Sequence, residues 1–431
     1  MTLRKVRDDL SDAQDNRYQV ILYNPNGGSR YKKTVRGKSL AKRHHDEMAV
    51  KLRSGGVAVT EDRHRTFREF TVQYLASRNL GPHTRRNYDN ALRLHLYPAL
   101  GDVRISSLAL KKLLLDGILA KIEKQAGAGQ RRNAETLLRT VLNNAVAAGM
   151  LDRSPYGGVK RPTTTRVKGA PYRIDIVDAV RVRDHALTPR PGTHEAECAQ
   201  HAALVVAMIG TGLRIGEVLG IDPTTDIDTD HRMLKVVRQV QYINPRACNA
   251  CRRLDQPAEG CPDCEAGGYV YCPPKGNDAS KRTVPLPQFV LASISALQLR
   301  NGVQSIALPW GETTGPSQPH SLLFHSLRSP DKPLNQAGFS SVIARTGKRL
   351  ALPRPLSPHS FRHRYTSVLA NAGVPQIVID TITGHKPTGS VTHEVYTEAE
   401  QKGIDMARDA IESAWERAQA RASAPARLHA V

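Results

Sequence analysis

The sequence has no apolar run that approaches the about 20 residues of a membrane-spanning helix, and its start, MTLRKVRDDL, lacks the apolar segment of a secretory signal. We therefore expect neither membrane insertion nor secretion. Acidic side chains are scarce beside basic ones, since 62 Lys and Arg residues face 40 Asp and Glu residues and give a net charge of +22. This excess points to a polyanionic partner. Nucleic acid is the leading class, ahead of a ribosome-like particle or an anionic membrane surface.

Cysteine is rare outside one segment, because five of the six cysteines lie between residues 248 and 272. Such clustering favours a metal site in a reducing cytoplasm over a disulfide framework. The pairs CNAC and CPDC predict one tetrahedral zinc site with the thiolate ligands Cys248, Cys251, Cys261 and Cys264. Cys272 is a spare thiol, and free thiols in a loop are the alternative. Four cysteines leave no open coordination position, so we expect a structural zinc.

The chain is long enough for two or three domains, and 40% of its residues are hydrophobic, as in globular proteins. The first part predicts two strands and one helix, at 17–24, 30–37 and 39–56. This small basic sheet could contact DNA or could be a plain structural hairpin. The next part predicts four helices separated by Gly or Pro, at 67–76, 81–100, 109–125 and 130–150. A linker rich in Pro, Gly and Thr follows.

The remainder of the chain mixes helical and strand patterns. Helices are predicted at 194–210 and within 211–221, and two strands are predicted at 233–243 and 281–287. The Cys-rich insertion separates these strands, and helices are expected to resume at residue 321 and to continue to the C-terminus. The sequence therefore predicts a multidomain protein, mainly α with small β elements.

The stretch SPHSFRHRYTS predicts a helix with Ser357 as its N-cap and Pro358 at the first position. His359 and Arg362 are three residues apart, so they share a helical face beside backbone N–H groups that lack intrahelical partners. This face could therefore bind an anion. The alternative is a basic helix face that is simply exposed to solvent. Arg214 follows a Thr-Gly turn at the start of another helix, where an arginine offers a planar fork to a phosphate.

Three motifs in this order, TGLRIGE, PHSFRHRYTSVLANAGVPQIVIDTITGHKP and HEVYTEA, resemble those of the tyrosine recombinases, also called phage integrases. The resemblance covers most of the chain. It implies that Arg214 and Arg362 stabilise negative charge on a scissile DNA phosphate, where rigid cations help most. It further implies that Tyr396 is the nucleophile, which forms a 3′-phosphotyrosyl bond and so conserves the phosphodiester energy for resealing.

Three further roles follow from the resemblance. His359 would accept or relay the tyrosine proton, His385 would hydrogen-bond the phosphate, and Lys275 would protonate the departing 5′ oxygen. Lys281 competes with Lys275 because it lies nearer the strand, and Tyr365 is separated from the nucleophile only by the family spacing. Among the other residues of the first motif, Glu217 is expected to pair with a basic side chain as a structural orienter.

The resemblance also implies an architecture for the whole chain. The expected domains are an arm-binding-like sheet and helix module, a helical core-binding (SAM-like) domain, a linker, a mixed α+β catalytic domain with the Cys-rich insertion, and a tail, at 1–60, 64–162, 163–171, 172–416 (insertion 245–274) and 417–431. The implied partners are double-stranded DNA at core and arm sites, three further copies in a homotetramer, and accessory DNA-bending or directionality proteins, with no membrane. The chemistry would need no metal, and the protein would act in the bacterial cytoplasm, associated with the nucleoid.

Two other functions stay open at this point. A type IB topoisomerase shares the chemistry but relaxes DNA without exchanging partners, and a DNA-binding regulator could carry an inactive recombinase fold. The arm-like N-terminus and a C-terminal helix at 401–420, which could dock on a neighbouring subunit, favour recombination. Because all six catalytic positions are filled, an inactive fold is disfavoured. We therefore expect an enzyme that integrates or excises a phage or other mobile element.

Overall fold

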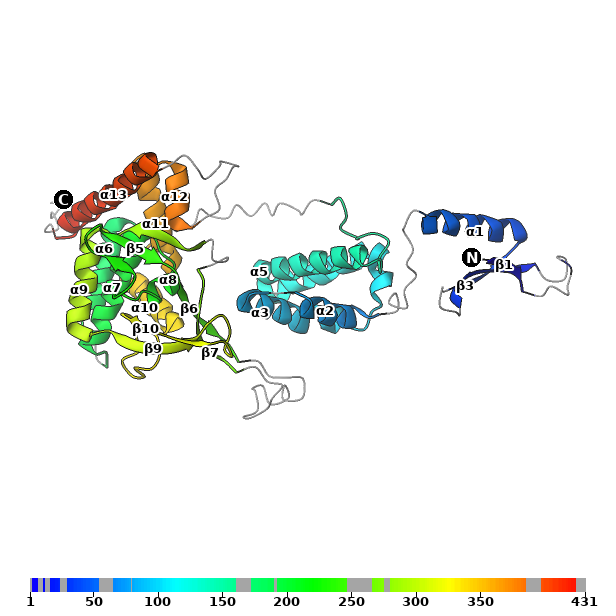
Figure 1. Ribbon diagram of the computed structural model, residues 1–431, viewed down its shortest axis with the longest axis horizontal. Helices are drawn as coiled ribbons and strands as arrows, with labels where there is room; N and C mark the ends of the chain where they lie inside the picture. Colours follow the sequence, from blue (N-terminus) through cyan, green and yellow to red (C-terminus); the bar gives the residue numbers. More distant parts are fainter. Residues whose placement is uncertain are drawn as a thin grey trace, which may run out of the picture. The chain divides into compact units, whose positions relative to one another are not determined.

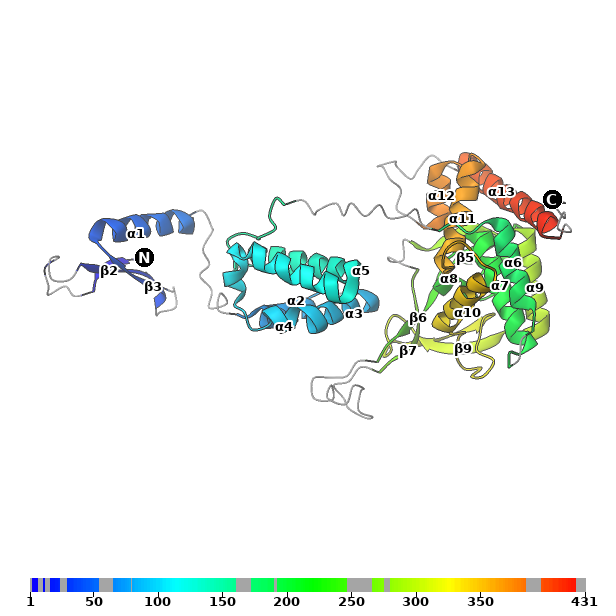
Figure 2. The same cartoon turned by 180° about the vertical axis from the view of Figure 1, so that it is seen from behind.

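The computed structural model describes residues 2–6, 11, 16–23, 29–53, 65–78, 80–159, 172–189, 192–245, 266–274, 280–384 and 397–423. The chain divides into two compact units, residues 1–165 and residues 166–431 (Figures 1 and 2). Within the described part of the chain, no helix is long and apolar enough to cross a membrane.

The first unit begins with a small antiparallel sheet and one helix. Their bounds are β1 Thr2–Lys5, β2 Arg17–Tyr23, β3 Ser29–Arg36 and α1 Lys38–Arg53. The strands pair in the order β1-β2-β3, and α1 contacts all three of them. Tyr18 and Val20 alternate along β2 and are buried, as is Ala41 on α1. The two predicted strands and the predicted helix are confirmed, and β1 is an addition.

A helical bundle completes the first unit. Its elements are α2 Phe67–Ala76, α3 Pro82–Asn90, the π-helical turn η2 Ala91–Leu96, α4 Tyr97–Leu100, the 3₁₀ turn η3 Ile105–Leu110 and α5 Lys112–Ala147. A capping box sets the start of α2, because the Thr66 side chain accepts from the backbone N–H of Glu69 and Glu69 accepts from that of Thr66. Gly127 kinks α5 with a φ of 86°, so α5 corresponds to two predicted helices. The four-helix prediction is confirmed.

The second unit is built around one buried helix. Its helices are α6 Ile176–Leu187, α7 Glu195–Thr211, α8 Ile215–Leu219, α9 Gln288–Asn301, α10 Gln336–Arg349, α11 Pro358–Asn371, α12 Gln376–Thr383 and α13 Thr397–Ser423. The sequence AALVVAMIG in α7 is apolar on every side, and α7 is accordingly buried from Gln200 to its end, in contact with α6, α9 and α11. This confirms the predicted buried helix.

Three small sheets accompany these helices in the described part of this unit. Their strands are β4 Ile227–Asp228, β5 Met233–Val236, β6 Gln239–Ile243, β7 Gly268–Cys272, β8 Arg282–Pro285, β9 Gln304–Pro309 and β10 Ser317–Leu322. The expected single strand at 233–243 is split, because β5 pairs with β4 and β8 whereas β6 pairs with β7. At the break, the buried Arg238 donates to both carboxylate oxygens of Asp226, at 2.6 and 3.1 Å. β7, with Cys272, lies inside the segment 245–274 that was expected to be the insertion, so the connection between β6 and β7 is shorter than predicted and contains the other four cysteines of that segment.

Two expectations for the C-terminal part need correction. Helices do not resume at residue 321, because β9 and β10 form an antiparallel pair through Leu322 and the next helix is α10. The final helix also continues past residue 416, the expected end of the catalytic domain, to Ser423. A two-stranded sheet tolerates Pro319 in β10 because the unpaired side of an edge strand needs no N–H donor.

Helix α13 covers the core of its own unit. It contacts α6, α11 and α12, and Ile411 and Trp415 are buried. The Trp415 ring stacks on Phe289 of α9, with ring centroids 4.7 Å apart. In this chain the helix expected to dock on a neighbouring subunit therefore packs within its own unit.

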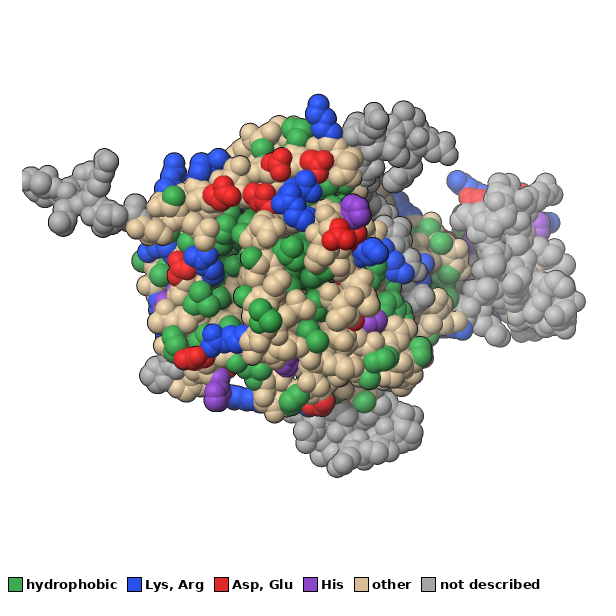
Figure 3. All heavy atoms as spheres, turned by 60° about the vertical axis from the view of Figure 1, so that its left-hand side comes forward, with side chains coloured by type: hydrophobic (Ala, Val, Ile, Leu, Met, Phe, Trp, Pro, Cys, Tyr) green, Lys and Arg blue, Asp and Glu red, His purple; other side chains and the backbone are tan. Residues whose placement is uncertain are grey.

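One face of the second unit shows how its surface charge is arranged. Figure 3 shows acidic and basic side chains interspersed over the described part of this face, without a large area of one sign. Phosphate contacts by a DNA-binding protein come from clustered Lys and Arg. This face therefore offers no such cluster among its described side chains.

Candidate active site

Arg214 is positioned by the way the preceding helix ends. Helix α7 stops at Thr211, and Gly212 adopts the left-handed conformation, with a φ of 64°. A Cβ atom on Gly212 would lie 2.3 Å from Cδ1 of Tyr365, so conformation and space both require glycine. Arg214 then occupies the N-cap of α8, at the helix start that the sequence predicts. Its side chain keeps 20% of its surface exposed, so a ligand can reach the guanidinium.

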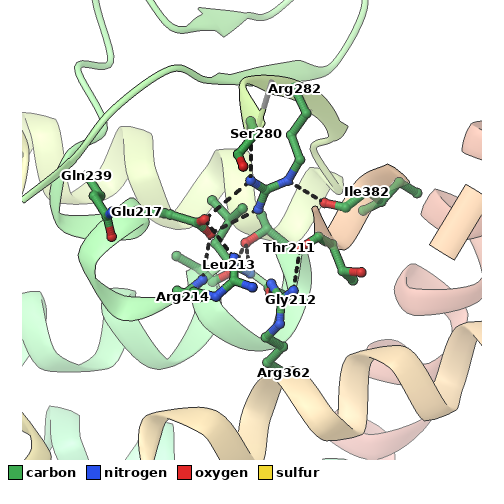
Figure 4. Close-up of polar contacts among 12 residues, drawn as sticks. Thr211, Gly212, Leu213, Arg214, Glu217, Gln239, Ser280, Arg282, Arg362 and Ile382 are labelled. Atoms are coloured by element: carbon green, nitrogen blue, oxygen red, sulfur yellow. Dashed lines mark hydrogen bonds and ion pairs between the residues drawn. The ribbon is translucent and has the colours of Figure 1, made fainter. Parts of the chain in front are cut away.

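A buried carboxylate joins this arginine to a second one (Figure 4). Glu217 accepts from the backbone N–H of Arg214 at 2.9 Å and from its Nη1 at 3.1 Å. Arg282 of β8 donates to the same carboxylate from Nη2 at 2.9 Å and from Nη1 at 3.3 Å. Burial would raise the pKa of Glu217, but the hydrogen bonds and charge of Arg282, and then those of Arg214, hold that pKa below its ordinary value. Glu217 is thus the ionised orienter that the sequence predicts.

Arg362 lies on the other side of the same turn. It is 2% exposed, and its Nη1 donates to the carbonyl of Gly212 at 2.8 Å while Nη2 donates to the carbonyl of Thr383. Burial, reinforced by the charge of Arg214, lowers the pKa of Arg362 to about 10. This value is far above neutrality, so the guanidinium keeps its charge. The structure therefore brings Arg362 of α11 against the Gly212 turn that precedes Arg214, as the motifs predict.

Arg282 is a site residue that sequence reasoning missed. Besides holding Glu217, its Nε donates to the carbonyl of Ile382 at 2.7 Å and its Nη1 to the carbonyl of Ser280 at 3.3 Å (Figure 4). The side chain is only 5% exposed. The one available signal is the basic pair at the start of KRTVPLP, which the sequence analysis assigned to a strand and to Lys281.

His359 lies in the first turn of α11. The helix begins as predicted, with Ser357 at the N-cap in a capping box with Ser360 and with proline at the first position. His359 is exposed, and its ring meets that of His363 edge to face at 5.1 Å. Burial, followed by the charges of Arg173 and Arg362, lowers the pKa of His363. His359 is therefore the accessible histidine of this pair.

Several predicted residues lie outside the part of the chain that the structure describes. They are the predicted catalytic residues Lys275, His385 and Tyr396 and the predicted zinc ligands Cys248, Cys251, Cys261 and Cys264. Among the residues that are described, no group of three or more His, Cys, Asp or Glu side chains could hold a metal ion. The assignments to these seven residues therefore stay predictions.

Cys272 is described, and its surroundings bear on the zinc prediction. It is half-buried at the end of β7, and its Sγ donates to Oε1 of Gln241 at 3.2 Å. Burial raises the pKa of this thiol to about 11. Gln241 of the paired strand β6 thus already engages this thiol.

Tyr365, the competing tyrosine, is fully buried beneath Gly212. Its hydroxyl has no hydrogen-bond partner, and burial raises the pKa of the phenol. A nucleophile must approach a phosphate in solvent-accessible DNA and lose its proton. Tyr365 is suited to neither step, so it serves as packing for the Gly212 turn.

The charges around Glu217 leave a cationic site. One buried carboxylate faces Arg214 and Arg282, and Arg362 lies beside them, so the positive charges outnumber the negative one. Only Arg214 among these arginines has a substantially exposed side chain, whereas the other two hold backbone carbonyls. Such a preorganised arrangement can stabilise a phosphate that gains negative charge in a transition state.

The comparisons with known proteins agree with this geometry. Residues 191–402 match the family model of the Phage integrase family. Tyrosine recombinase XerC of Pelobacter propionicus is 23% identical over 348 residues, which cover 78% of this chain and 95% of that protein. The chain therefore belongs to the phage integrase family, the tyrosine recombinases, and is a site-specific DNA recombinase.

Two solved structures share the fold. The Tn1549 transposon integrase, solved in complex with transposon right end DNA, gives a TM-score of 0.57 at 18% identity, over 82% of this chain and 99% of that chain. A lambda integrase tetramer bound to a Holliday junction gives a TM-score of 0.50 at 15% identity, over 91% of this chain and 94% of that chain. The mainly helical fold with small sheets is thus that of a tyrosine recombinase.

Proposed function

We propose that this recombinase cleaves and rejoins DNA through a 3′-phosphotyrosyl intermediate at Tyr396 and so integrates or excises a mobile element. The observation that carries the proposal is the cationic site in which Arg214 bonds the buried Glu217 and Arg362 of α11 bonds the carbonyl of Gly212, two residues before Arg214. Tyrosine recombinases need no cofactor for catalysis, so positioned side chains must supply the whole transition-state stabilisation.

The described arginines divide the work on the phosphate. Arg214 would contact a non-bridging oxygen directly, because its guanidinium is accessible and its backbone is fixed at the N-cap of α8. Arg362 would add a buried positive charge from below the same turn. The accessible His359 would take or relay the proton of the tyrosine, with His385 as a hydrogen-bond donor to the phosphate.

Departure of the 5′ oxygen needs a proton, and a lysine near the start of β8 would supply it. Lys275 lies in the connection between β7 and β8, and the exposed Lys281 immediately precedes β8. We assign the acid to Lys275 on the family motif. The test of the function as a whole is a covalent protein–DNA adduct on a nicked suicide duplex that carries the element's core site. If the wild-type protein forms no adduct on its own core site, the proposed function is wrong.

The assembly would be a homotetramer on double-stranded DNA. In the lambda integrase structure, a tetramer is bound to a Holliday junction. Strand exchange between two duplexes cuts four strands and so needs four active sites. Because α13 packs within its own unit, it would have to be released before it could join neighbouring subunits. Accessory DNA-bending or directionality proteins would set the direction, and the expected location is the nucleoid of a bacterial cytoplasm. Light scattering of the protein on a synthetic junction tests the tetramer.

The N-terminal sheet and helix would bind arm sites apart from the core site. A separate sheet with its own buried residues supports this assignment, since it can fold without contributing to the site around Arg214. Deletion of residues 1–60 should abolish binding to outlying arm sequence and leave core-site binding within about threefold, because the core contacts lie after residue 64. Footprinting of both proteins is the measurement. An unchanged protected region would refute an arm-binding role.

The Cys-rich insertion between β6 and β7 would hold one structural zinc. Cys248, Cys251, Cys261 and Cys264 form two Cys-x-x-Cys pairs, and such a site supplies folding energy to a polar loop. The support is the sequence pattern, together with the Cys272 thiol, which is hydrogen-bonded to Gln241 of the paired strand β6.

We expect about one zinc per chain and its loss in the double variant Cys261→Ser, Cys264→Ser. Because the loop precedes Lys275, the variant should cleave at least about tenfold more slowly while it binds DNA nearly as well. Elemental analysis of protein purified without chelator measures the metal. The matched control is Cys272→Ser, which should keep its zinc. Parent protein without zinc would eliminate the site, and zinc lost from the control would make Cys272 a ligand.

A further inference from the structure

Arg282 connects three parts of the second unit that are distant in sequence. Its contacts to Glu217 span 65 residues, and its contact to Ile382 spans 100 residues. The side chain is buried, and three of its donor groups point at fixed oxygen acceptors (Figure 4). A buried arginine with this many oriented bonds is rigid, and it holds in register the elements that it touches.

The first consequence concerns charge. Glu217 is a fully buried carboxylate that bonds both Arg214 and Arg282. If Arg282 were absent, Arg214 alone would have to neutralise this carboxylate. The guanidinium of Arg214 would then be drawn onto Glu217, and its charge would be offset before any phosphate arrived. Arg282 therefore decides how much of the Arg214 charge is left for a ligand.

The second consequence concerns the end of α12. The last carbonyls of a helix have no intrahelical partner, and two arginines supply donors here. Arg282 donates to Ile382, and Arg362 donates to the next carbonyl, that of Thr383. Arg362 also donates to the carbonyl of Gly212. The two arginines therefore hold the end of α12, the Gly212 turn and β8 in fixed positions relative to one another.

We propose that Arg282 is a positioning residue for DNA cleavage, which holds the charge of Glu217 so that Arg214 remains available to the scissile phosphate and which fixes the end of α12 beside Arg362. The inference rests on the proposed function, and it adds a residue that does not touch the DNA. If Arg282 had only a structural role, it would stabilise the fold without affecting how much of the Arg214 charge is available to the phosphate. The two roles differ in what happens when the charge of Glu217 is removed as well.

The experiment compares single-turnover cleavage of the nicked suicide duplex by variants of the full chain. Arg282→Gln should cleave about 10- to 100-fold more slowly than the wild type, as expected when an outer-shell partner is lost. The double variant Arg282→Gln, Glu217→Gln should recover at least about tenfold over the single variant, because no buried carboxylate remains to capture Arg214. Arg282→Lys should be intermediate, since it keeps the charge but not the fork.

Arg238→Gln is the matched control. It breaks a buried arginine–carboxylate pair of similar geometry in the same unit, and its other bond goes to the carbonyl of Gly220, at the opposite end of α8 from Arg214. We expect a comparable fall in Tm with cleavage per DNA-bound protein close to that of the wild type. DNA binding and Tm are measured for every variant, so that loss of fold is separated from loss of rate.

The results distinguish the inference from the function beneath it. A slow Arg282→Gln variant that the second substitution rescues supports the positioning role. Wild-type cleavage by Arg282→Gln, or a double variant no faster than the single one, overturns the role while the proposed function stands. Wild-type protein without any adduct refutes the proposed function and this inference with it.

Discussion

A Tyr396→Phe variant will form no covalent adduct on a nicked suicide duplex and will still bind the core site. The substitution removes the attacking oxygen and keeps the aromatic ring, so the loss is confined to the chemistry. The bonds of Arg214 and Arg282 to Glu217 join side chains that the substitution leaves unchanged, so the variant should retain its phosphate contacts. Denaturing gels measure the adduct, and mobility-shift titration measures binding.

The second tyrosine of the motif region provides the control. Tyr365→Phe removes a fully buried hydroxyl that has no hydrogen-bond partner. The protein should therefore fold as the wild type does, and its cleavage rate should change by no more than about twofold. Persistence of the adduct in Tyr396→Phe, together with its disappearance in Tyr365→Phe, would transfer the nucleophile to Tyr365. Persistence in both variants would point to another residue altogether.

Local sequence signals predict the helices of this protein well. The segment 67–76 is found as α2 with the same bounds, because Thr66 and Glu69 form a capping box immediately before an apolar repeat. The two helices predicted at 109–125 and 130–150 are found as one kinked helix, α5 Lys112–Ala147, and the kink lies at Gly127, between them. In such cases the first residue, the last residue and the buried face of the helix are all determined by residues close to one another in the sequence.

The short strands are predicted less well because their pairing is not local. β1 is a basic four-residue segment, and only its pairing with β2 makes it a strand. β10, SQPHSL, contains a proline and few apolar residues, and β9 supplies the partner that stabilises it. Sequence patterns carry little information about such edge strands, since burial and cross-strand neighbours decide their propensity.

The same distinction separates the site residues. Arg214 and Arg362 lie in local motifs, a Thr-Gly turn and a helix start, and the structure places both at those positions. Arg282 was missed because the two partners that tie it to the site, Glu217 and the backbone carbonyl of Ile382, lie 65 and 100 residues away. No periodicity or spacing within β8 records a bond to the end of α12.

Replacing Arg362 with Gln will slow cleavage by about 10²- to 10³-fold, the effect of removing one preorganised donor from a charged transition state. The side chain is nearly inaccessible, and its guanidinium donates to Gly212 and Thr383. Gln is neutral, shorter and unable to bridge both carbonyls, so the Gly212 turn that presents Arg214 loses its brace as well as a charge. Single-turnover cleavage at saturating protein is the measurement, and DNA binding should fall by less than about tenfold.

Arg364→Gln is the matched control for this prediction, because it lies two residues further along α11 and holds a different part of the unit. Arg364 donates to the carbonyl of Ile174 and to the carboxylate of Asp175 at the start of α6, away from Glu217 and the Gly212 turn. Loss of these contacts should lower Tm and leave the cleavage rate of folded protein within about threefold. Equal loss of cleavage in both variants would mean that any disturbance of α11 slows the reaction. Arg362 would then have no specific role in stabilising the transition-state charge. Selective loss in Arg362→Gln would place the second transition-state charge at Arg362.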